Sequence, residues 1–513
     1  MPALKPAGKA VLIGLAVIAL IVGGNWIIKN GFAEKILPKG KANVGVSKVT
    51  KVEGKKPIRV CVNTWGGFAG GEYFNKGFKA STDSRYFTEY GVPVEFVLID
   101  DFDAARAAWK AGQVDLLWQT ADAFPNEASS LSSFSPRVVF QADWSDGGDV
   151  ALGTRDIQSV EDLKGRTVAL ALGTPSHSLL LWSLNASGIG YDDVKIVECK
   201  TAIEAASIFK AGKVDAAVVW SPDDQDCLAA VPGSHVLTSS KTARIIADVF
   251  YAKKEFVDSH PEELHALIEG WFKGAAEINT NPQAFEDAAQ ILAAGLNQPV
   301  DFCKTAIKNT RLCTYGDNVN FFNLQGTYGG VKGEDLYSKT ARLYQAIGYL
   351  RDEPPPWRMV TETSILRGIS LTGSDQAAWG EAKFAQATPE EAQAPAFSTK
   401  RLTVNFPTNS AVLDATARTI IDHDFVDIAK NFNRYRIRIE GNTDNTGTDE
   451  LNRRLSKARA QAVAAYLIET YRFDPDRFTV RGNGWDEQVA SNDSDEGRAK
   501  NRRTDFELLN TTY

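Results

Sequence analysis

The middle of the chain alternates short apolar runs with longer segments of helical period. A first passage predicts strands at residues 58–63, 94–99 and 114–118 and an alanine-rich helix at 103–111. The same order returns in a second passage, with predicted strands at 167–172, 194–198 and 214–220 and helices at 176–185 and 202–211. Strands that alternate with helices are typical of βαβ units and of a mainly parallel sheet. The pattern therefore predicts an α/β fold for this region.

The two passages also resemble each other residue by residue. Residues 109–118 read Trp-Lys-Ala-Gly-Gln-Val-Asp-Leu-Leu-Trp, and residues 209–218 read Phe-Lys-Ala-Gly-Lys-Val-Asp-Ala-Ala-Val. In each, a glycine stops a helix and an aspartate precedes an apolar strand. Two similar halves predict two α/β lobes with a cleft between them. In open α/β sheets, ligands bind outside the carboxyl ends of the strands.

The pattern changes twice more before the C-terminus. Amphipathic helices predicted at 261–278, 282–295 and 333–350 complete the two lobes. A segment rich in Ala, Gln, Glu and Pro then predicts an exposed linker over residues 371–399. The linker separates a large domain, residues 56–370, from a small one, residues 400–513.

The small domain contains both the alternating pattern of strands and the three- to four-residue spacing of helices. Alternation predicts strands through Leu402, Val404 and Phe406, through Tyr435, Ile437 and Ile439, and at 478–481 and 504–508. A helix is predicted at 415–432, and another begins near Asp449 with Leu451, Leu455, Ala458 and Ala462 on its buried face. Together these elements predict a compact α+β sandwich.

A loop and a helix of the small domain hold a candidate binding site. Asp444 lies in the loop Gly-Asn-Thr-Asp-Asn-Thr-Gly at 441–447, and Asn452, Ser456 and Arg459 share a face of the next helix. A carboxylate accepts from an ammonium group, and a guanidinium is a two-pronged donor for a carboxylate. The pair suits an amino-acid head as ligand; the alternative is an internal Asp444–Arg459 salt bridge on a solvated surface.

The small domain carries several separated motifs in a recognisable order. The loop is followed by Asn452, by Leu-Ser-x-Ala-Arg-Ala at 455–460 and by Gly-Arg-Ala-Lys-Asn-Arg-Arg at 497–503. Over residues 400–510 the chain resembles the OmpA-like peptidoglycan-binding domain. The resemblance implies that Asp444 binds the amine and Arg459 the carboxylate of diaminopimelate in the peptidoglycan stem peptide, with Asn452 and Arg502 lining the pocket. The alternative for Arg502 is a solvated basic edge shared with Arg498 and Arg503.

The large domain has motifs of a second family. They are residues 157–168, Ile-Gln-Ser-Val-Glu-Asp-Leu-Lys-Gly-Arg-Thr-Val, then Gly-Thr-Pro-Ser-His at 173–177 and Gly-Lys-Val-Asp-Ala-Ala at 212–217. This region resembles type 2 periplasmic solute-binding proteins, in particular the nitrate, sulfonate and taurine binders of transport systems. The resemblance implies ligand contacts from Thr64, Trp65, Gly66, Gly67, Thr120, Asp122, Thr174, Ser176, His177, Trp220 and Ser221.

The type of ligand is inferred from the second lobe. The segment from Thr174 to Ser178 opens a helix, whose free N–H groups and dipole favour an anionic group. We therefore expect a small anionic or zwitterionic solute, with Trp144 and Asp149 near the hinge between the lobes. The alternatives are that Ser176 only caps its helix and that Trp65 and Trp220 are core aromatics.

The N-terminus predicts a membrane anchor. Residues 10–28 form an uncharged apolar run about as long as a bilayer-spanning helix, after a short N-terminus, 1–9, and before a spacer, 29–55. The alternative is a cleaved signal peptide. Lysines flank the run on both sides and do not set its orientation, but a peptidoglycan binder must reach the wall. We expect a single-pass bacterial inner-membrane protein with its bulk in the periplasm.

Composition and the remaining motifs narrow the function further. The net charge of −7 over 513 residues disfavours a nucleic-acid partner. The five cysteines have no metal-binding spacing, although Cys303 and Cys313 are close enough for a local disulfide. No catalytic triad or phosphate-binding loop is present in the sequence, and we expect neither enzymatic activity nor a cofactor.

Two functional hypotheses remain after these exclusions. The first is a tethered envelope protein that binds peptidoglycan and a small solute and contacts an inner-membrane protein. The alternative is a structural scaffold whose solute-binding-like domain is degenerate and docks partner proteins. An enzyme on the two-lobe fold is a third possibility, but the sequence offers no candidate catalytic residue.

Overall fold

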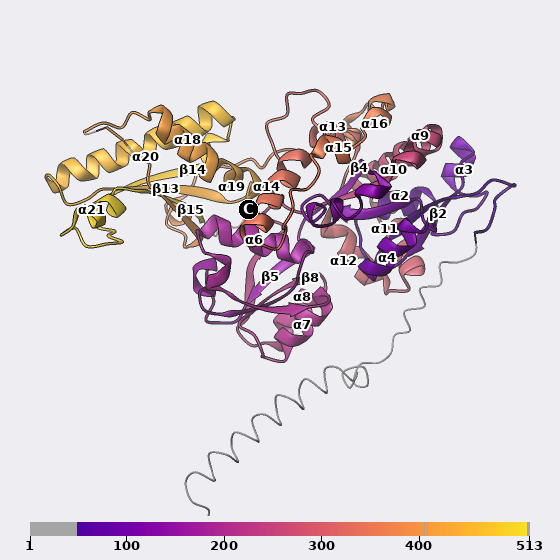
Figure 1. Ribbon diagram of the computed structural model, residues 1–513, viewed down its shortest axis with the longest axis horizontal. Coiled ribbons are helices and arrows are strands. Elements are labelled where there is room, and N and C mark those ends of the chain that lie inside the picture. The colour runs from indigo at the N-terminus through magenta and orange to yellow at the C-terminus, as the bar shows by residue number, and fades with distance from the viewer. Residues whose placement is uncertain (1–48, 405, 408, 510–513) are drawn as a thin grey trace, which may run out of the picture. The chain divides into compact units, whose positions relative to one another are not determined.

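The computed structural model describes residues 49–404, 406–407 and 409–509. The predicted membrane helix at 10–28 lies outside these residues. Within the described part of the chain, no helix is both long enough and apolar enough to cross a membrane. The large domain and the small domain belong to one compact unit (Figure 1).

The first lobe is built on a six-stranded sheet. Its strands, in spatial order, are β11 (Thr310–Leu312), β4 (Pro136–Ser145), β10 (Ala247–Lys253), β3 (Leu116–Thr120), β1 (Ile58–Val62) and β2 (Val94–Leu98). Strand β1 pairs in parallel with β2 and β3, whereas β10 runs antiparallel to both β3 and β4. All residues of β1 and β3 are buried, as expected for strands covered on both faces.

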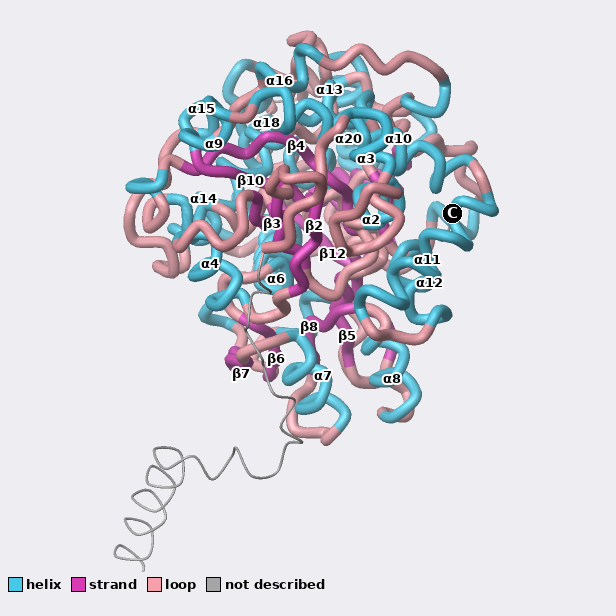
Figure 2. The backbone as a smooth tube through the Cα atoms, turned by 90° about the vertical axis from the view of Figure 1, so that its right-hand side faces the viewer, coloured by secondary structure: helices cyan, strands magenta, loops and turns pink. Residues whose placement is uncertain are grey.

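The second lobe repeats this arrangement in a five-stranded sheet. Its order is β7 (Lys195–Cys199), β6 (Thr167–Ala171), β8 (Ala216–Trp220), β5 (Asp149–Gly153) and β9 (His235–Ser239). Strand β6 is parallel to β7 and β8, and β5 runs antiparallel beside β8. Figure 2 shows the strands of the two sheets with helices around them. The two-lobed α/β architecture predicted from the internal repeat is confirmed.

The chain crosses between the lobes at two places. Strand β4 ends at Ser145 in the first sheet and β5 begins at Asp149 in the second, so the first crossover is three residues long. The return crossover joins β9 to β10 over residues 240–246. Trp144 and Asp149 therefore flank the first crossover, where the hinge was expected.

Helices complete both lobes. Around the first sheet they are α2 (Ala69–Phe74), α3 (Arg85–Tyr90), α4 (Phe102–Lys110), α5 (Pro125–Ala128), α9 (Lys254–Ser259), α10 (Pro261–Thr280), α11 (Pro282–Leu296), α12 (Val300–Lys308), α13 (Tyr315–Phe321), α15 (Trp357–Val360) and α16 (Ser364–Gly368). The second lobe has α6 (Pro175–Ser187), α7 (Ala202–Lys210) and α8 (Asp223–Ala230), and α14 (Gly333–Ala346) packs against both α5 and α6.

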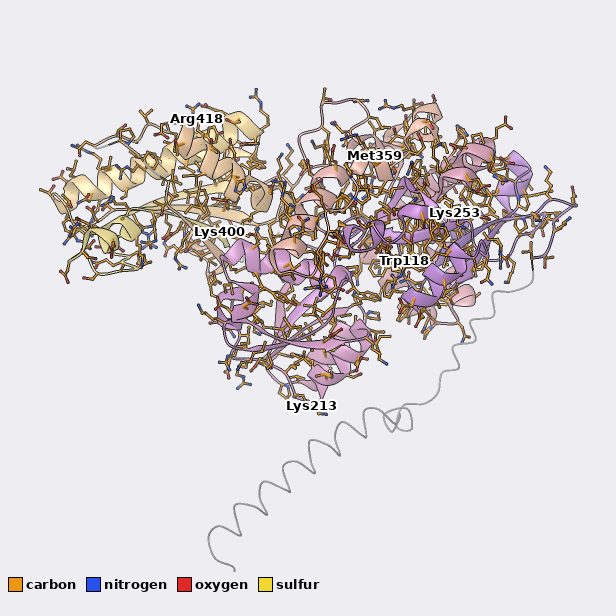
Figure 3. The ribbon with its side chains drawn as sticks, viewed as in Figure 1. Trp118, Lys213, Lys253, Met359, Lys400 and Arg418 are labelled. Atoms are coloured by element: carbon orange, nitrogen blue, oxygen red, sulfur yellow. The ribbon has the colours of Figure 1, made fainter. Side chains whose placement is uncertain are left out.

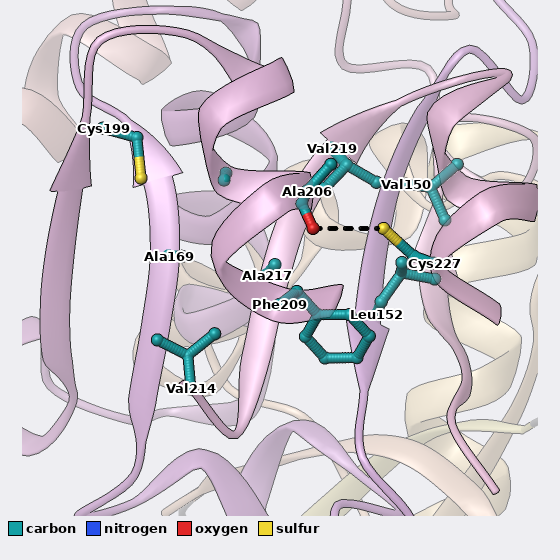
Figure 4. Packing of buried hydrophobic residues seen from close by; sticks show 11 residues of the cluster. Val150, Leu152, Ala169, Cys199, Ala206, Phe209, Val214, Ala217, Val219 and Cys227 are labelled. Atoms are coloured by element: carbon teal, nitrogen blue, oxygen red, sulfur yellow. Dashed lines mark hydrogen bonds between the residues drawn. The ribbon is translucent and has the colours of Figure 1, made fainter. Parts of the chain in front are cut away.

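The repeated sequence motif has the same structural role in both lobes. Gly112 and Gly212 follow α4 and α7 with φ of +70° and +65°, a backbone conformation that ends a helix and favours glycine. In the second lobe the motif then supplies Val214 and Ala217 to a buried cluster that includes Phe209 (Figure 4). In the same cluster the Cys227 thiol lies 3.6 Å from the Ala206 carbonyl oxygen.

The small domain is a four-stranded sheet with helices. The strand order is β12 (Ala396–Leu402), β15 (Thr504–Leu509), β13 (Arg436–Asn442) and β14 (Phe478–Gly484), and the helices are α17 (Pro389–Ala392), α18 (Ala415–Asp424), α19 (Val426–Asn431), α20 (Asp449–Tyr471) and α21 (Asp495–Asn501). The predicted helix 415–432 is divided at Phe425, a fully buried residue that packs on Phe506.

Two predictions for the small domain are wrong in detail. Its first strand ends at Leu402, so Val404 and Phe406 lie beyond it and border a cavity instead. The buried face of α20 carries Asn452 and Ser456 rather than Leu451 and Leu455. The helix turns this face inward because glycines of β13 and β14 leave room for its backbone.

Most residues of the predicted linker are exposed, but several of its groups contact the large domain. The Asp317 carboxylate accepts a hydrogen bond from the backbone of Trp379 at 2.6 Å, and Arg244 forms a 2.9 Å ion pair with Glu381. At its end, β12 lies beside α6, where the Lys400 ammonium donates to the Asn185 carbonyl at 2.9 Å (Figure 3). The linker is therefore exposed along most of its length and is held to the large domain by a few hydrogen bonds and ion pairs.

Candidate functional sites

The cleft between the lobes contains a narrow cavity of about 20 Å³. The lining comes from the carboxyl ends of β1, β3 and β8, from the starts of β5, β10 and α6, and from the second crossover. It consists of Asn63, Trp65, Trp118, Thr120, Ile246 and Asp248 on the first lobe and Asp149, Pro175 and Trp220 on the second. The sheet ends therefore converge on a site where the fold was expected to place a ligand.

Three tryptophans form the walls of this cavity. Trp118 lies in the first lobe (Figure 3) and Trp220 in the second. The Phe102 ring lies between them, with its centroid 5.2 Å from that of Trp118 and 6.2 Å from that of Trp220. Trp65 packs against Gly148, where an added Cβ atom would lie 2.0 Å from the indole ring. Trp65 and Trp220 are half-buried at the cavity and are not enclosed core aromatics.

Buried carboxylates gather at the same place. Asp149 and Asp248 line the cavity, and Asp143 lies opposite Asp248 in the β4–β10 pairing. The Asp149 carboxylate accepts a 2.8 Å hydrogen bond from the Ser145 hydroxyl, and the Trp65 indole nitrogen lies 3.4 Å from each Asp143 oxygen. Asp122 is fully buried close to these residues. None of the nine residues that line the cavity is basic.

Burial dominates the titration of these acids. Loss of hydration raises the pKa of Asp122 and of Asp149 to about 7. It also raises the pKa of Asp143, and it raises that of Asp248 well above its usual range, with the negative charges of Asp143 and Asp149 adding to the effect. The group therefore holds protons near neutral pH and loses them to solvent when a positive charge is bound nearby.

Several polar atoms of the lining have no hydrogen-bond partner among the described residues. They are Asn63 Oδ1, Trp118 Nε1, Thr120 Oγ1, Asp149 Oδ1 and Trp220 Nε1. Thr120 and Asp149 are 1% and 3% exposed, so bulk water does not satisfy them. Buried polar groups in proteins are normally hydrogen-bonded, and such a concentration of exceptions marks a binding site.

The structure separates the residues expected around the solute. Trp65, Thr120 and Trp220 line the cavity, whereas Thr64 is engaged by Asp100 at its backbone and hydroxyl. The other expected residues, Gly66, Gly67, Asp122, Thr174, Ser176, His177 and Ser221, lie outside the cavity lining. Gly67 still has a role, because a Cβ atom there would overlap the Asp143 carboxylate at 1.9 Å.

The His177 side chain is buried and has a packing role. Its Nδ1 accepts a 3.1 Å hydrogen bond from the backbone of Gly173, and its ring packs among Tyr191, Tyr344 and Tyr349. Burial lowers the pKa of this imidazole to about 4. His177 therefore does not reach the cavity as expected from the sequence, because Tyr191, Tyr344 and Tyr349 surround its ring.

Sequence reasoning missed Asn63, Trp118, Ile246 and Asp248 in the lining. Trp118 was placed at the last position of a predicted strand, but β3 continues to Thr120. Asp248 lies in β10, a strand that returns from the second lobe, and no local motif marks it. Only the pairing of β10 with β3 and β4 brings this carboxylate to the cavity.

The second candidate site lies in the small domain, at a cavity of about 50 Å³. Its lining consists of Val404, Phe406, Gly441, Asn442, Arg459, Arg502, Arg503 and Thr504. Arg503 is neutralised by two hydrogen bonds to Asp505, at 3.0 and 2.9 Å. Arg459 and Arg502 are the cationic groups left to face a ligand.

Asp444 pairs with Arg502 and not with Arg459. One Asp444 oxygen accepts from Arg502 at 2.6 Å, and the other accepts from the backbone of Thr446 at 2.9 Å. Despite the desolvation that opposes it, these bonds hold the pKa of the Asp444 carboxyl below its usual range. The internal Asp444–Arg459 salt bridge considered from the sequence is therefore not the pairing found.

Arg459 is held in place by other groups. Its Nε donates to the Ser410 carbonyl at 3.0 Å, and its guanidinium lies 5.0 Å from the centroid of the Phe406 ring. Asn452 stabilises the loop instead of facing the cavity, since its amide donates to the Thr446 carbonyl at 2.9 Å. The expected set thus divides into Arg459 and Arg502 at the cavity, Asp444 beside it, and Asn452 behind the loop.

Neither site offers metal-binding or redox chemistry among the described residues. No group of three or more His, Cys, Asp or Glu side chains there could hold a metal ion. All five cysteines are buried free thiols, so the local disulfide considered for Cys303 and Cys313 is not formed.

Two protein families match separate parts of the chain. Residues 405–502 match the OmpA family, and residues 77–285 match the family described as NMT1/THI5 like. The chain thus carries an OmpA domain at its C-terminal end and an NMT1/THI5-like domain in its middle. Both resemblances expected from the motifs are confirmed.

Individual relatives match one region each. The outer membrane protein Omp38 of Acinetobacter baumannii is 52% identical over 66 residues, which is 13% of this chain and 18% of that protein. A Brucella abortus protein whose name places it among binding proteins is 27% identical over 200 residues, 38% of this chain and 61% of its own length. The chain therefore spans less than two thirds of either relative.

Among solved structures, the chain is similar to the periplasmic aliphatic sulphonate binding protein SsuA of Escherichia coli. The two are 17% identical with a TM-score of 0.47, over 65% of this chain and 97% of that one. The periplasmic nitrate-binding protein NrtA of Synechocystis is 11% identical with a TM-score of 0.46, over 61% of this chain and 87% of that one.

Proposed function

We propose that this chain is an envelope protein that binds peptidoglycan through its small domain and a small solute in the cleft of its large domain. The observation that carries the proposal is the presence of two separate cavities, each lined by charged groups that lack full internal compensation. The two sites lie in the two regions that match different families.

The small domain is proposed to bind the diaminopimelate of the stem peptide. Arg459 presents its guanidinium at the cavity with its Nε already fixed by the Ser410 carbonyl, which leaves terminal N–H groups for a carboxylate. Asp444 would accept the amine. Its present partner Arg502 is half-exposed whereas Asp444 is buried, so the ligand amine would take the place of the Arg502 guanidinium as the partner of this carboxylate.

The large domain is proposed to act as a receptor and not as a degenerate scaffold. In a degenerate cleft the side chains would satisfy one another, as Arg503 and Asp505 do in the small domain. The lining of the cleft instead keeps buried polar atoms without partners among the described residues. A binding role without turnover is proposed, because the lining contains no nucleophile paired with a base.

The localisation proposal rests on the sequence. Residues 10–28 would anchor the chain in the inner membrane, with the wall-binding and solute-binding domains in the periplasm. A protein fixed at the membrane and at the wall does not diffuse freely. We therefore propose an inner-membrane protein as the partner that responds to the solute-loaded domain.

Co-sedimentation with purified sacculi tests the wall-binding half of the proposal. We expect Arg459→Lys and Asp444→Asn to weaken binding by on the order of tenfold, because a lysine is a point charge and not a fork, and an amide does not pair with an ammonium. Arg454→Ala is the control, since Arg454 is exposed on the same helix. Equal sedimentation of all four proteins would refute the assigned pocket.

The solute half is tested by calorimetric unfolding of the full chain with a panel of small ions and amino acids. A ligand that binds only the folded state raises the transition of the domain that binds it. We expect diaminopimelate to shift the small domain and at least one solute to shift the large domain. A large-domain transition that no solute moves would favour the scaffold alternative.

A further inference from the structure

We propose that the cleft is built for a small organic cation, a primary ammonium ion, held between three tryptophans and the Asp149–Asp248 carboxylates. This inference rests on the proposed solute-binding function and replaces the anionic or zwitterionic solute expected from the sequence. It names the ligand class from the geometry of the cavity.

The first argument is the distribution of charge. Asp149 and Asp248 line the cavity from opposite lobes, and Asp143 and Asp122 are fully buried outside its lining. The lining contains no lysine, arginine or histidine to offset these acids. Once ionised, these acids would repel an anion in a medium of low polarity, whereas a cation would stabilise their ionised form and pair with it.

The second argument is the aromatic surface. Trp65, Trp118 and Trp220 line one small cavity and come from both lobes. The electron-rich faces of indole rings attract ammonium groups, and tryptophan is the most favourable aromatic residue for this contact. The carboxylates and the indole rings of this cavity therefore both attract a cation.

The third argument comes from the helix that led to the anionic expectation. At the start of α6 the residue that reaches the cavity is Pro175, which has no N–H group. The backbone N–H groups of His177 and Ser178 both donate to the Thr174 carbonyl, at 2.9 and 3.2 Å. The helix therefore does not present the cluster of free N–H donors that an anion requires.

The hydrogen-bonding capacity of the lining specifies the kind of cation. Asn63 Oδ1, Thr120 Oγ1 and Asp149 Oδ1 are acceptors without a partner among the described residues, and the indole N–H groups of Trp118 and Trp220 are the unpartnered donors of the same lining. An –NH₃⁺ group has three donors and no acceptor. A primary ammonium matches these acceptors, whereas a quaternary ammonium would leave them unsatisfied.

Isothermal titration of the full chain with ethanolamine and propylammonium tests the proposal, with nitrate, methanesulfonate and tetramethylammonium as comparison probes. We expect the primary amines to bind most tightly and to bind more tightly at pH 8 than at pH 6. Over this range Asp122 and Asp149, with pKa values near 7, lose protons while the amines stay charged. Titration in buffers of different ionisation enthalpy should show proton release.

Substitutions give a second readout. Asp248→Asn and Trp220→Leu should each weaken amine binding by on the order of tenfold. Asp352→Asn, an exposed aspartate, should leave binding unchanged. An unchanged shift of the small-domain transition by diaminopimelate would show that the rest of the variant is intact. The wild-type pH profile and proton release do not depend on whether the variants fold.

The outcomes separate this inference from the proposed function. Tight binding of nitrate or methanesulfonate with proton uptake would overturn the cation assignment and leave a solute receptor. Preferential binding of tetramethylammonium would overturn the assignment of N–H donors. If no probe binds while diaminopimelate still shifts the small domain, both the cation assignment and the receptor function of the large domain are refuted.

Discussion

The ligand-free cleft should destabilise the protein at neutral and alkaline pH, and the substitution Asp149→Asn measures this cost. Asp149 is 3% exposed, and burial raises the pKa of its carboxyl from 3.8 to about 7. The folded state therefore holds this proton more tightly than the unfolded chain does. The stability that the protonated group contributes is complete below pH 3.8 and is lost as pH rises through 7.

The magnitude follows from the two pKa values. With 3.8 for the unfolded chain and 7 for the folded protein, ionisation of Asp149 lowers the free energy of unfolding by roughly 2 kcal/mol at pH 5 and roughly 4 kcal/mol at pH 8. The asparagine variant does not bear this cost. We expect it to gain stability relative to wild type by about 2–3 kcal/mol between the two pH values. Removing the charge also eases ionisation of Asp122, which adds to the gain.

Urea unfolding of the full chain at pH 5 and pH 8, followed by tryptophan fluorescence, makes the comparison. The amide can still accept the 2.8 Å hydrogen bond from Ser145, so the substitution changes charge more than geometry. Asp352→Asn is the control for removing an exposed negative charge. If the difference between Asp149→Asn and wild type is the same at both pH values, the raised pKa and the electrostatic account of the cleft are wrong.

Two further substitutions test the packing of each domain. Glu72 is fully buried, neither of its carboxylate oxygens has a partner among the described residues, and burial raises its pKa well above the usual range. In urea unfolding, Glu72→Gln should therefore stabilise the large domain at pH 9 by at least about 1 kcal/mol and should change its stability little at pH 5. Equal effects at the two pH values would contradict this prediction. At Gly441 an added Cβ atom would lie 2.1 Å from the Ser456 carbonyl oxygen, so Gly441→Ala should destabilise the small domain by about 1–3 kcal/mol in calorimetry. Gly380→Ala is its control because an added Cβ meets no atom within 4 Å, and an equal transition temperature for both variants would refute the close approach.

Periodicity predicted the elements of the large domain well. The predicted helices at 261–278 and 282–295 correspond to α10 and α11, and both begin at a proline, which is suited to the first turn of a helix. The internal repeat predicted the two lobes because each copy encodes the same sequence of helix, stop and buried strand. Local patterns sufficed here because each strand and helix forms from residues close together in the chain.

In the small domain, the spacing of apolar residues alone did not predict which face of α20 is buried. The helix beginning at Asp449 was assigned a buried face through Leu451 and Leu455, on the assumption that the most apolar residues lie inward. The structure instead buries Asn452 and Ser456, since the Gly484 N–H donates to the Ser456 hydroxyl at 3.0 Å and Asn452 secures the loop. Hydrogen bonds and close backbone approach, which depend on the partner strands, decided the orientation.

The negative charge of the cleft could not be predicted from any local segment of the sequence. Asp143, Asp149 and Asp248 lie in three different strands, with Asp248 about a hundred residues after the others, and none belongs to a motif. The strand pairing places Asp143 opposite Asp248, and the crossover places Asp149 in the facing lobe. The sequence indicated an anion because the start of α6 is local and visible, whereas the opposing carboxylates are assembled only by the fold. The sign of the ligand's charge therefore follows from the tertiary arrangement and not from the most recognisable motif.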